Sequence, residues 1–334
     1  MKTIFNKLYH LKNLNESESY YLFDHIINNK LHPIELSAIL TAIKIRSPSI
    51  EEILGAVKAF QKHSVYFPKP EYPFADIAGT GGDNFNTINI STMSALVASS
   101  FNVKIIKHCN TGISSKIGSS DILQKLNINI HLNTQESKKM LDNLNICFLF
   151  APQYHPGFQY AKLVRKILKT KTIFNILGPL LNPAHPKLSV IGVYSEKLLF
   201  PIANILKFLK YQKAFIIHSD GIDEVTLHSV TKVVEVNYDK ILSYTLSPQD
   251  FGLENISKKF FFNNSPEKNY NICKNLFSTQ GKIEYQYLIA VNTAILLKLF
   301  GYNNLIENTQ NALKKIQNGE VNIHIQKIIK RSYI

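Results

Sequence analysis

The fold class is decided by one stretch of sequence, Asp76-Ile77-Ala78-Gly79-Thr80-Gly81-Gly82-Asp83-Asn84-Phe85-Asn86-Thr87-Ile88-Asn89-Ile90-Ser91-Thr92. It joins a short apolar run, residues 74–78, which predicts a strand, to a helix that begins near Ser91. Three glycines between them let the backbone turn tightly and bring amide groups close to a ligand. Because a helix N-terminus also offers free N–H groups to an anion, the stretch predicts a phosphate-binding loop.

Two better-known phosphate motifs do not fit this loop. No Lys-Ser/Thr pair follows the glycines, as a Walker loop requires, and Asn84 stands where the last glycine of a dinucleotide fingerprint belongs. A glycine-rich turn with Ser91 as an ordinary helix N-cap is the alternative interpretation.

Strand and helix signals alternate on the C-terminal side of this loop, which predicts a mainly parallel sheet covered by helices. Strands are expected at 74–78, 103–106, 128–131, 146–150, 189–193 and 214–218. Helices are expected from Ser91, near Ser120, from Thr134, and at 283–300 and 304–317. Residues 236–280 give mixed signals, and we assign them only to this α/β domain.

The N-terminal part has helical periodicity and little strand signal. Helices are expected at 17–29, 33–45 and 49–63, the last opened by a capping box at Ser49-Ile50-Glu51-Glu52. Residues 66–73 contain three prolines and predict a hinge. We therefore expect a helical domain at 1–70, completed by helices near 160–185, and an α/β domain at 71–334.

Composition sets the broad class. The chain has 334 residues, 45% hydrophobic content and a formal charge of +14, enough to bury the cores of two domains. Three cysteines without a C-x-x-C pair indicate neither a disulfide framework nor a thiolate zinc site. Without a signal-peptide pattern or an apolar run of about 20 residues, we expect a cytoplasmic protein. The scattered lysines indicate a compositional bias at least as well as a surface for a polyanion.

Two further loops carry polar side chains at the same edge of the predicted sheet. Residues 107–121 contain two lysines, a histidine, an asparagine and several hydroxyls, which suit phosphate and sugar oxygens. Residues 218–224 place Asp223 beside Glu224, and adjacent carboxylates repel each other unless a cation compensates. Because loops at the carboxyl ends of strands face one crevice, we expect magnesium to bridge these carboxylates to a phosphorylated ligand. A solvated acidic turn is the alternative.

A fourth segment, residues 151–158, leads into a helix that contains Arg165. A guanidinium group can bind a carboxylate through two parallel hydrogen bonds, and the neighbouring aromatic side chains can enclose a flat ring. Without a family to compare, Arg165 is more often an ordinary charge on a helix surface.

Together these segments resemble the anthranilate phosphoribosyltransferase family, in order and in separation, along nearly the whole chain. The matching motifs are Gly79–Asp83, Asn89–Thr92, Lys107–Ser119, Ala151–Pro156, Arg165, Phe174–Pro183 and Asp220–Glu224. The resemblance implies a nucleoside phosphorylase/phosphoribosyltransferase-like fold, with a small N-terminal helical domain and a larger α/β domain whose mainly parallel sheet is flanked by helices. It also implies transfer of the phosphoribosyl group of phosphoribosyl pyrophosphate to the amine of anthranilate, in tryptophan biosynthesis.

The same resemblance assigns residues to three ligands. Anthranilate would contact Gly79, Asn110, Arg165, His155 and Pro179. Phosphoribosyl pyrophosphate would contact Gly79, Gly82, Asp83, Thr87, Asn89, Ile90, Ser91, Thr92, Lys107, His108, Cys109, Asn110, Thr111, Gly112, Ile113, Ser114, Ser115 and Ser119. Magnesium, expected as two ions per subunit, would be held by Ser91, Asp223 and Glu224.

No residue is assigned as a general base. The aromatic amine of anthranilate is uncharged at neutral pH, so it can attack before it loses its proton. The resemblance also implies a homodimer formed through the helical part, and we expect neither a membrane nor a nucleic acid as a partner.

Two positions depart from the family pattern Lys-His-Gly-Asn-Arg, because this chain has Cys109 and Thr111. We expect the Cys109 side chain to crowd the substrate or to force a different backbone conformation, since only glycine enters the left-handed region freely. Thr111 removes one cation near the substrates.

Two alternatives remain at this point. A pyrimidine nucleoside phosphorylase has a related fold and phosphate loop, but it would lack Asn110, Arg165 and the Asp223-Glu224 pair. A non-catalytic relative that binds nucleic acid is supported by the charge of +14 and the altered second loop. Retention of every position assigned to metal and anthranilate favours the transferase.

Overall fold

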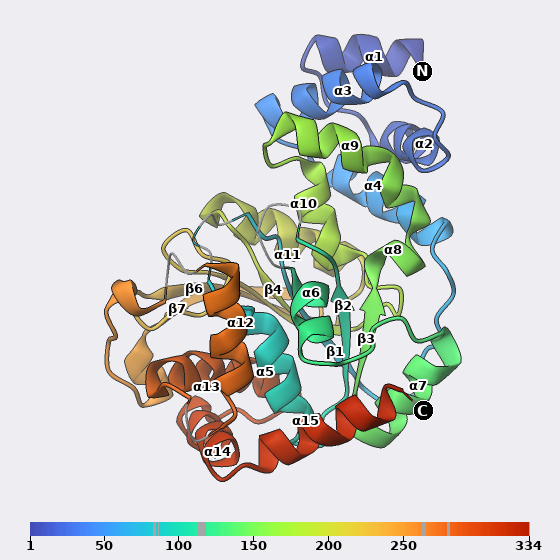
Figure 1. Ribbon diagram of the computed structural model, residues 1–334. Helices are drawn as coiled ribbons and strands as arrows, with labels where there is room; N and C mark the ends of the chain where they lie inside the picture. Colours follow the sequence, from blue (N-terminus) through green and yellow to red (C-terminus); the bar gives the residue numbers. More distant parts are fainter. Residues whose placement is uncertain (83–84, 86, 113–117, 262–264, 279–280, 334) are drawn as a thin grey trace.

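The computed structural model describes residues 1–82, 85, 87–112, 118–261, 265–278 and 281–333. Within these residues, a small helical domain forms one end of the molecule, and a sheet with its covering helices forms the other (Figure 1). This arrangement confirms the predicted fold class, a helical domain joined to a larger α/β domain with a mostly parallel sheet.

The helical domain is built from four N-terminal helices and two that come from the middle of the chain. The N-terminal helices are α1 (Lys2–Tyr9), α2 (Glu16–Ile27), α3 (Pro33–Arg46) and α4 (Ile50–Lys62). They are joined by α9 (Gln159–Leu168), which packs on α2 and α3, and by α10 (Ile173–Leu177), which packs on α3 and α4. The predicted capping box of α4 is confirmed, because Glu52 N donates to Ser49 Oγ at 3.3 Å and Ser49 N donates to Glu52 Oε2 at 2.9 Å.

The sheet of the larger domain is mixed, with strand order β3-β2-β1-β4-β5-β6-β7. Its strands are β1 (Ala75–Gly79), β2 (Ile105–Cys109), β3 (Ile146–Phe150), β4 (Leu188–Gly192), β5 (Lys213–His218), β6 (Thr231–Asn237) and β7 (Lys240–Leu246). The first five are parallel, and β6 and β7 form an antiparallel hairpin at one edge. Five of the predicted strands are confirmed within a few residues, and the hairpin is an addition.

The remaining helices cover both faces of the sheet (Figure 1). On one face lie α5 (Ile90–Ser99), α7 (Thr134–Leu144), α13 (Ile283–Lys298), α14 (Leu305–Gln317) and α15 (Glu320–Arg331). On the other face, α11 (Leu199–Phe208) shares a second core with the helical domain. The short helices α6 (Ser119–Lys125), α8 (Ala151–Tyr154) and α12 (Pro266–Asn275) complete the domain.

Helix α13 is apolar on nearly every side because it lies between α5 and α14. Its 16 residues fall short of the roughly 20 that a bilayer requires. Across the described ranges, no helix combines the length and the apolar character needed to cross a membrane.

The strand predicted at 128–131 is wrong. Ile128 and Ile130 are indeed buried and their neighbours are more exposed, so the alternation of the sequence reports one-sided burial correctly. However, two of its backbone N–H groups donate to side chains and not to a neighbouring strand. Asn129 N donates to Ser332 Oγ at 3.0 Å, and His131 N donates to Asn129 Oδ1 at 2.9 Å.

The strand order places a topological switch at the centre of the sheet. The chain runs outward from β1 through β2 to β3 and then returns to β4 on the other side of β1. Gly79 at the end of β1 lies in register with Gly192 at the end of β4. In open α/β sheets a ligand site forms outside the carboxyl ends of the strands at such a point.

Candidate active site

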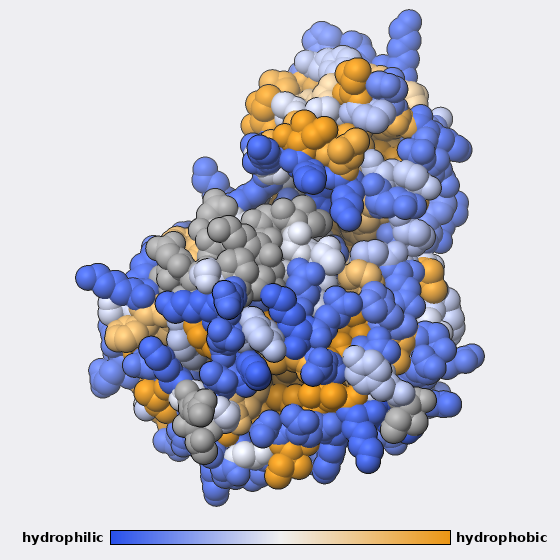
Figure 2. Space-filling model, in the orientation of Figure 1, coloured by the Kyte–Doolittle hydropathy of each residue, from blue (hydrophilic) through white to orange (hydrophobic). Residues whose placement is uncertain are grey.

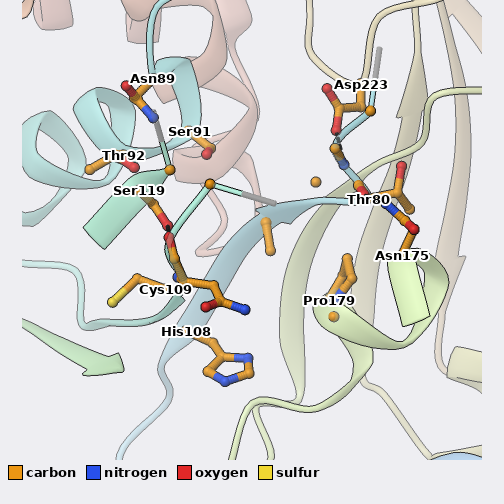
Figure 3. Close-up of a pocket in the computed structure, with 18 of the residues that line it drawn as sticks. Thr80, Asn89, Ser91, Thr92, His108, Cys109, Ser119, Asn175, Pro179 and Asp223 are labelled. Carbon is orange, nitrogen blue, oxygen red and sulfur yellow. Dashed lines mark hydrogen bonds between the residues drawn. The ribbon is translucent and has the colours of Figure 1, made fainter. Parts of the chain in front are cut away.

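One pocket lies outside the carboxyl ends of β1, β2 and β5, and the loops predicted to carry chemistry converge on it (Figure 3). Its lining includes these predicted site residues: Gly79, Gly82, Thr87, Asn89, Ile90, Ser91, Thr92, Lys107, His108, Cys109, Asn110, Thr111, Gly112, Ser119, Arg165, Pro179, Asp223 and Glu224. Asp83, Ile113, Ser114 and Ser115 lie outside the described residues. His155 is buried behind the wall and does not line the pocket.

The phosphate-binding loop turns as its glycines predict. Gly81 and Gly82 both have positive φ, 62° and 76°, a region that favours glycine. After the turn, α5 begins at Ile90, so its first N–H groups face the pocket that Ser91 and Thr92 line. The loop therefore presents backbone donors from both the turn and the helix N-terminus.

The carboxylates of Asp223 and Glu224 accept hydrogen bonds from two of these backbone donors. Gly81 N donates to Asp223 Oδ2 at 2.7 Å, and Ser91 N donates to Glu224 Oε1 at 3.2 Å. Each carboxylate belongs to a residue only 8% exposed. Burial raises the pKa of Asp223, while the Gly81 amide and the Lys171 ammonium act in the opposite direction. Asp223 and Glu224 are therefore not a solvated acidic turn, because they reach across to the phosphate-binding loop.

Two glycines make this close approach possible. A Cβ on Gly79 would lie 2.3 Å from Asp223 Oδ2, and a Cβ on Gly192 would lie 1.6 Å from the carbonyl oxygen of Asp223. Any larger residue at either strand end would push the acidic loop outward. The glycines therefore fix the distance between the phosphate-binding loop and the carboxylates.

Lys107 lines the pocket, and its ammonium is bonded to two other protein atoms. Its side chain is 2% exposed, and Nζ donates to Ile77 O at 2.6 Å and to Ser91 Oγ at 3.2 Å. Burial lowers its pKa, and the nearby carboxylates of Asp76 and Glu224 oppose that shift. In this arrangement Lys107 orients the Ser91 hydroxyl.

The loop after β2 is tied into a compact cradle. Asn110 N donates to Ser119 Oγ at 3.1 Å, and Asp121 Oδ2 accepts from Gly112 N at 3.0 Å and from Gly118 N at 2.7 Å. These bonds join the two described ends of the loop at the start of α6. The serine and asparagine side chains are thereby held at the pocket wall, as Figure 3 shows for Ser119.

His108 and His155 form a neutral pair beneath the pocket. Their rings are 5.4 Å apart, and His155 Nε2 lies 2.6 Å from Leu181 O. Burial lowers the pKa of His108 to about 3 and that of His155 to about 4. His155 therefore supports His108 and Phe158, which line the pocket.

The expected distortion at Cys109 is not found. Cys109 ends β2 in regular register with Phe150, and it is absent from the residues with positive φ. Its side chain is 1% exposed and belongs to the main hydrophobic core. Figure 3 shows the sulfur pointing away from Pro179 and Asn175. The expectation that Cys109 forces a different backbone conformation is therefore wrong, because the strand accommodates a small buried side chain.

We predict that Cys109→Gly lowers the free energy of unfolding by about 1 to 2 kcal/mol, because a buried side chain is lost and glycine weakens a strand. Urea denaturation followed by circular dichroism measures this change. Cys109→Ala is the matched control and is expected to lose less, since it retains the Cβ. A glycine variant more stable than the parent would show that the cysteine is strained.

The pocket lining also carries a cation among aromatic rings. The guanidinium of Arg165 lies 5.1 Å from the centroid of the Phe174 ring, and Phe158 and Pro179 line the same pocket. Burial lowers the pKa of Arg165 to about 10, which leaves it charged at neutral pH. Within the described part of the chain, the guanidinium makes no hydrogen bond or ion pair. A half-buried cation beside flat rings suits an aromatic carboxylate.

Sequence reasoning missed two polar residues of the site, Thr80 and Asn175. Asn175 Nδ2 donates to Thr80 O at 3.4 Å, and Tyr194 N donates to Thr80 Oγ1 at 3.0 Å, so Thr80 joins three segments at the pocket wall. Both residues stand inside motifs that the sequence singled out, but neither carries a charge that would have marked it.

Comparison with known protein families identifies the class of protein to which this chain belongs. The model of the glycosyl transferase family helical bundle domain matches residues 2–64, and that of the glycosyl transferase family α/β domain matches residues 71–322. Fold and site together are those of a two-domain glycosyl transferase.

Comparison with individual proteins identifies the family within this class. The chain is 57% identical to anthranilate phosphoribosyltransferase of Buchnera aphidicola subsp. Acyrthosiphon pisum (strain Tuc7) over 98% of this chain and 96% of that one. It is 56% identical to the enzyme of Buchnera aphidicola subsp. Baizongia pistaciae over 99% of both. This protein belongs to the anthranilate phosphoribosyltransferase family.

Solved structures agree with this assignment. Anthranilate phosphoribosyltransferase from Thermus thermophilus superposes with a TM-score of 0.90 at 28% identity, covering 99% of each chain. The enzyme from Saccharomyces cerevisiae, solved in complex with PRPP and Mg, gives a TM-score of 0.88 at 28% identity over 99% of this chain and 97% of that one. These relatives favour the transferase over both the nucleoside phosphorylase and the nucleic-acid-binding alternatives.

Proposed function

We propose that this enzyme transfers the phosphoribosyl group of 5-phosphoribosyl 1-pyrophosphate to the amine of anthranilate. The products are N-(5-phosphoribosyl)anthranilate and pyrophosphate, in the second step of tryptophan synthesis from chorismate. The observation that carries this proposal is one pocket whose lining combines a backbone anion cradle and two carboxylates with the Arg165 guanidinium among aromatic rings.

Two groups of lining residues suit the two substrates. Arg165 would bind the carboxylate of anthranilate, while Asn110, Gly79 and Pro179 would border its ring, with His155 acting from behind the wall. The loop that begins at Gly79, the start of α5 and the cradle up to Ser119 would bind phosphoribosyl pyrophosphate. Holding the amine in line with the anomeric carbon is a positioning effect, which can contribute several kcal/mol to catalysis.

The acidic pair fits magnesium. Asp223, Glu224 and the Ser91 hydroxyl are hard oxygen donors, and magnesium in proteins is commonly held by one or two carboxylates together with phosphate oxygens. We propose two ions per subunit. Bound there, magnesium would neutralise the charge that develops on the departing pyrophosphate.

Protein groups around the magnesium site would also stabilise the negative charge that develops on the departing pyrophosphate. The amides of Gly81 and Ser91, which belong to the pocket lining, would also donate to phosphate oxygens. Lys107 would keep the Ser91 hydroxyl aimed at the pocket. No side chain is required as a general base, since the amine attacks uncharged. Burial lowers the pKa of His108 in the pocket lining and of His155 behind it, which makes both weak proton acceptors.

Loss of anthranilate fluorescence in the presence of phosphoribosyl pyrophosphate and magnesium tests this function directly. We expect turnover that stops when the metal is chelated and returns when magnesium is restored. A folded protein that shows no turnover under these conditions would contradict the proposed reaction.

We further propose a homodimer formed through the helical domain. Figure 2 shows hydrophobic atoms gathered over this domain, where Figure 1 places α3 and α9. Large apolar side chains are exposed on these two helices, namely Ile34 at 73%, Ile45 at 67%, Leu163 at 60% and Ile167 at 69%. Apolar patches of this kind commonly mark a protein interface. Light scattering should give the mass of a dimer for the parent and of a monomer for Leu163→Glu/Ile167→Glu.

The domain boundary and the compartment are also proposals. Residues 65–70, which include Pro68 and Pro70, lie between the two matched family models, which supports a boundary there. All three cysteines are free and buried thiols, which is consistent with a reducing cytoplasm.

A further inference from the structure

A lysine outside the predicted site lies at the edge of the phosphate-binding loop. Lys171 stands just before α10, and its aliphatic chain crosses the turn of the loop so closely that a Cβ on Gly82 would lie 3.0 Å from Lys171 Cε. Its ammonium lies 3.9 Å from the centroid of the Tyr194 ring. These contacts place the Lys171 side chain beside the loop.

Both contacts involve residues beside the pocket. Tyr194 follows β4, and its backbone N–H donates to Thr80 Oγ1 at 3.0 Å, which ties it to the wall of the pocket. Gly82 has φ +76°, so this turn is specific to glycine, and the bare backbone leaves room for the lysine chain. Cation–π contacts of this kind fix the direction of an ammonium group.

Lys171 is close in space to the acidic end of the pocket. Its side chain packs against Gly82, and the neighbouring Gly81 N donates to Asp223 Oδ2 at 2.7 Å. Gly82 and Asp223 both line the pocket. The Lys171 side chain is not part of the described lining, but it packs against Gly82 and so borders the end where we place the pyrophosphate group. Lys107, the cation that the sequence assigns to this ligand, is buried and bonded to Ile77 O and Ser91 Oγ.

We propose that Lys171 is a further substrate-binding residue, which binds the pyrophosphate group of phosphoribosyl pyrophosphate and holds it as it departs, with Tyr194 fixing the ammonium. This inference rests on the proposed function. In that reaction the bond from C1 of the ribose to the pyrophosphate oxygen breaks, and the oxygen keeps the electron pair. The amine nitrogen forms the new bond to C1 and releases its proton to solvent. Lys171 stays protonated throughout and donates hydrogen bonds.

Steady-state kinetics with Lys171→Met tests the proposal. We expect the KM for phosphoribosyl pyrophosphate and the inhibition constant of inorganic pyrophosphate, measured at saturating magnesium, to rise together by about tenfold. The KM for anthranilate should stay within twofold. Lys171→Arg should restore most of both constants, and Tyr194→Leu should raise both by a smaller factor.

Lys166→Met is the matched control, because Lys166 is an exposed lysine on the preceding helix α9. Thermal unfolding of each variant shows that the protein remains folded. Unchanged constants in Lys171→Met would overturn the proposal, and an equal rise in the KM of both substrates would assign Lys171 a structural role instead. Absence of turnover in the parent enzyme is the separate outcome that contradicts the proposed function, and pyrophosphate binding measured by calorimetry would then still test Lys171.

Discussion

Asp223→Ala/Glu224→Ala is expected to lower kcat/KM about a thousandfold, which corresponds to roughly 4 kcal/mol of transition-state stabilisation. Both carboxylates are buried at the pocket, and they reach the amides of Gly81 and Ser91, so their loss removes the anionic ligands for magnesium. The fluorescence assay over a range of magnesium concentrations measures the effect. The rate should not recover at high magnesium, because the ligands themselves are missing.

Asp220→Asn provides a control in the same loop. Asp220 is 47% exposed in its side chain and pairs with Lys258 and His228 instead of the phosphate-binding loop. Its change should leave kcat/KM within a few-fold of the parent. If the double alanine variant kept a tenth of the parent activity at saturating magnesium, the acidic pair would not be the metal site.

Arg165→Ala is expected to raise the KM for anthranilate about a hundredfold, the value of a charge-assisted, two-bond contact worth about 3 kcal/mol. The reason is that the described guanidinium has Phe174 as a stacking partner and no bonded anion until a substrate carboxylate arrives. The KM for phosphoribosyl pyrophosphate should change little. Kinetics with each substrate varied in turn separate the two effects.

Aniline sharpens this test because it has the amine of anthranilate without the carboxylate. The parent should prefer anthranilate strongly, and Arg165→Ala should lose most of that preference. Lys166→Ala, one position along α9 and exposed, should behave as the parent does. A variant that still discriminates between the two amines would place the carboxylate elsewhere in the pocket.

The convergence of the site was predictable because it follows from sheet topology. Parallel strands end at one edge, so the loops after residues 79, 109 and 218 had to meet there. The roles of individual side chains were harder to predict from the sequence. Lys107, which the sequence predicts to contact the phosphorylated substrate, lines the pocket but is buried and donates to Ile77 O and Ser91 Oγ. Alternation along a strand was not enough to reveal which polar atoms lie within reach.

Two errors in the predicted fold have physical causes. The burial pattern of 128–131 is that of a strand, but pairing requires a neighbouring backbone, and side chains supply the bonds instead. The β6–β7 hairpin was missed because its turn at Tyr238 and Asp239 has none of the Asn-Gly or Asp-Gly signals that mark tight hairpins, although Tyr238 adopts φ +51°.

The helical domain completes its core with segments from far along the chain. Buried residues of 4–60 share one cluster with those of α9 and α10 and with the far face of the sheet. A chain emerging from the ribosome therefore exposes the apolar faces of its first helices until roughly a hundred more residues are made. At about 5 to 20 residues per second this interval lasts about 5 to 20 s. Nascent chains of this protein should consequently engage chaperones early, and truncations that end before α9 should aggregate.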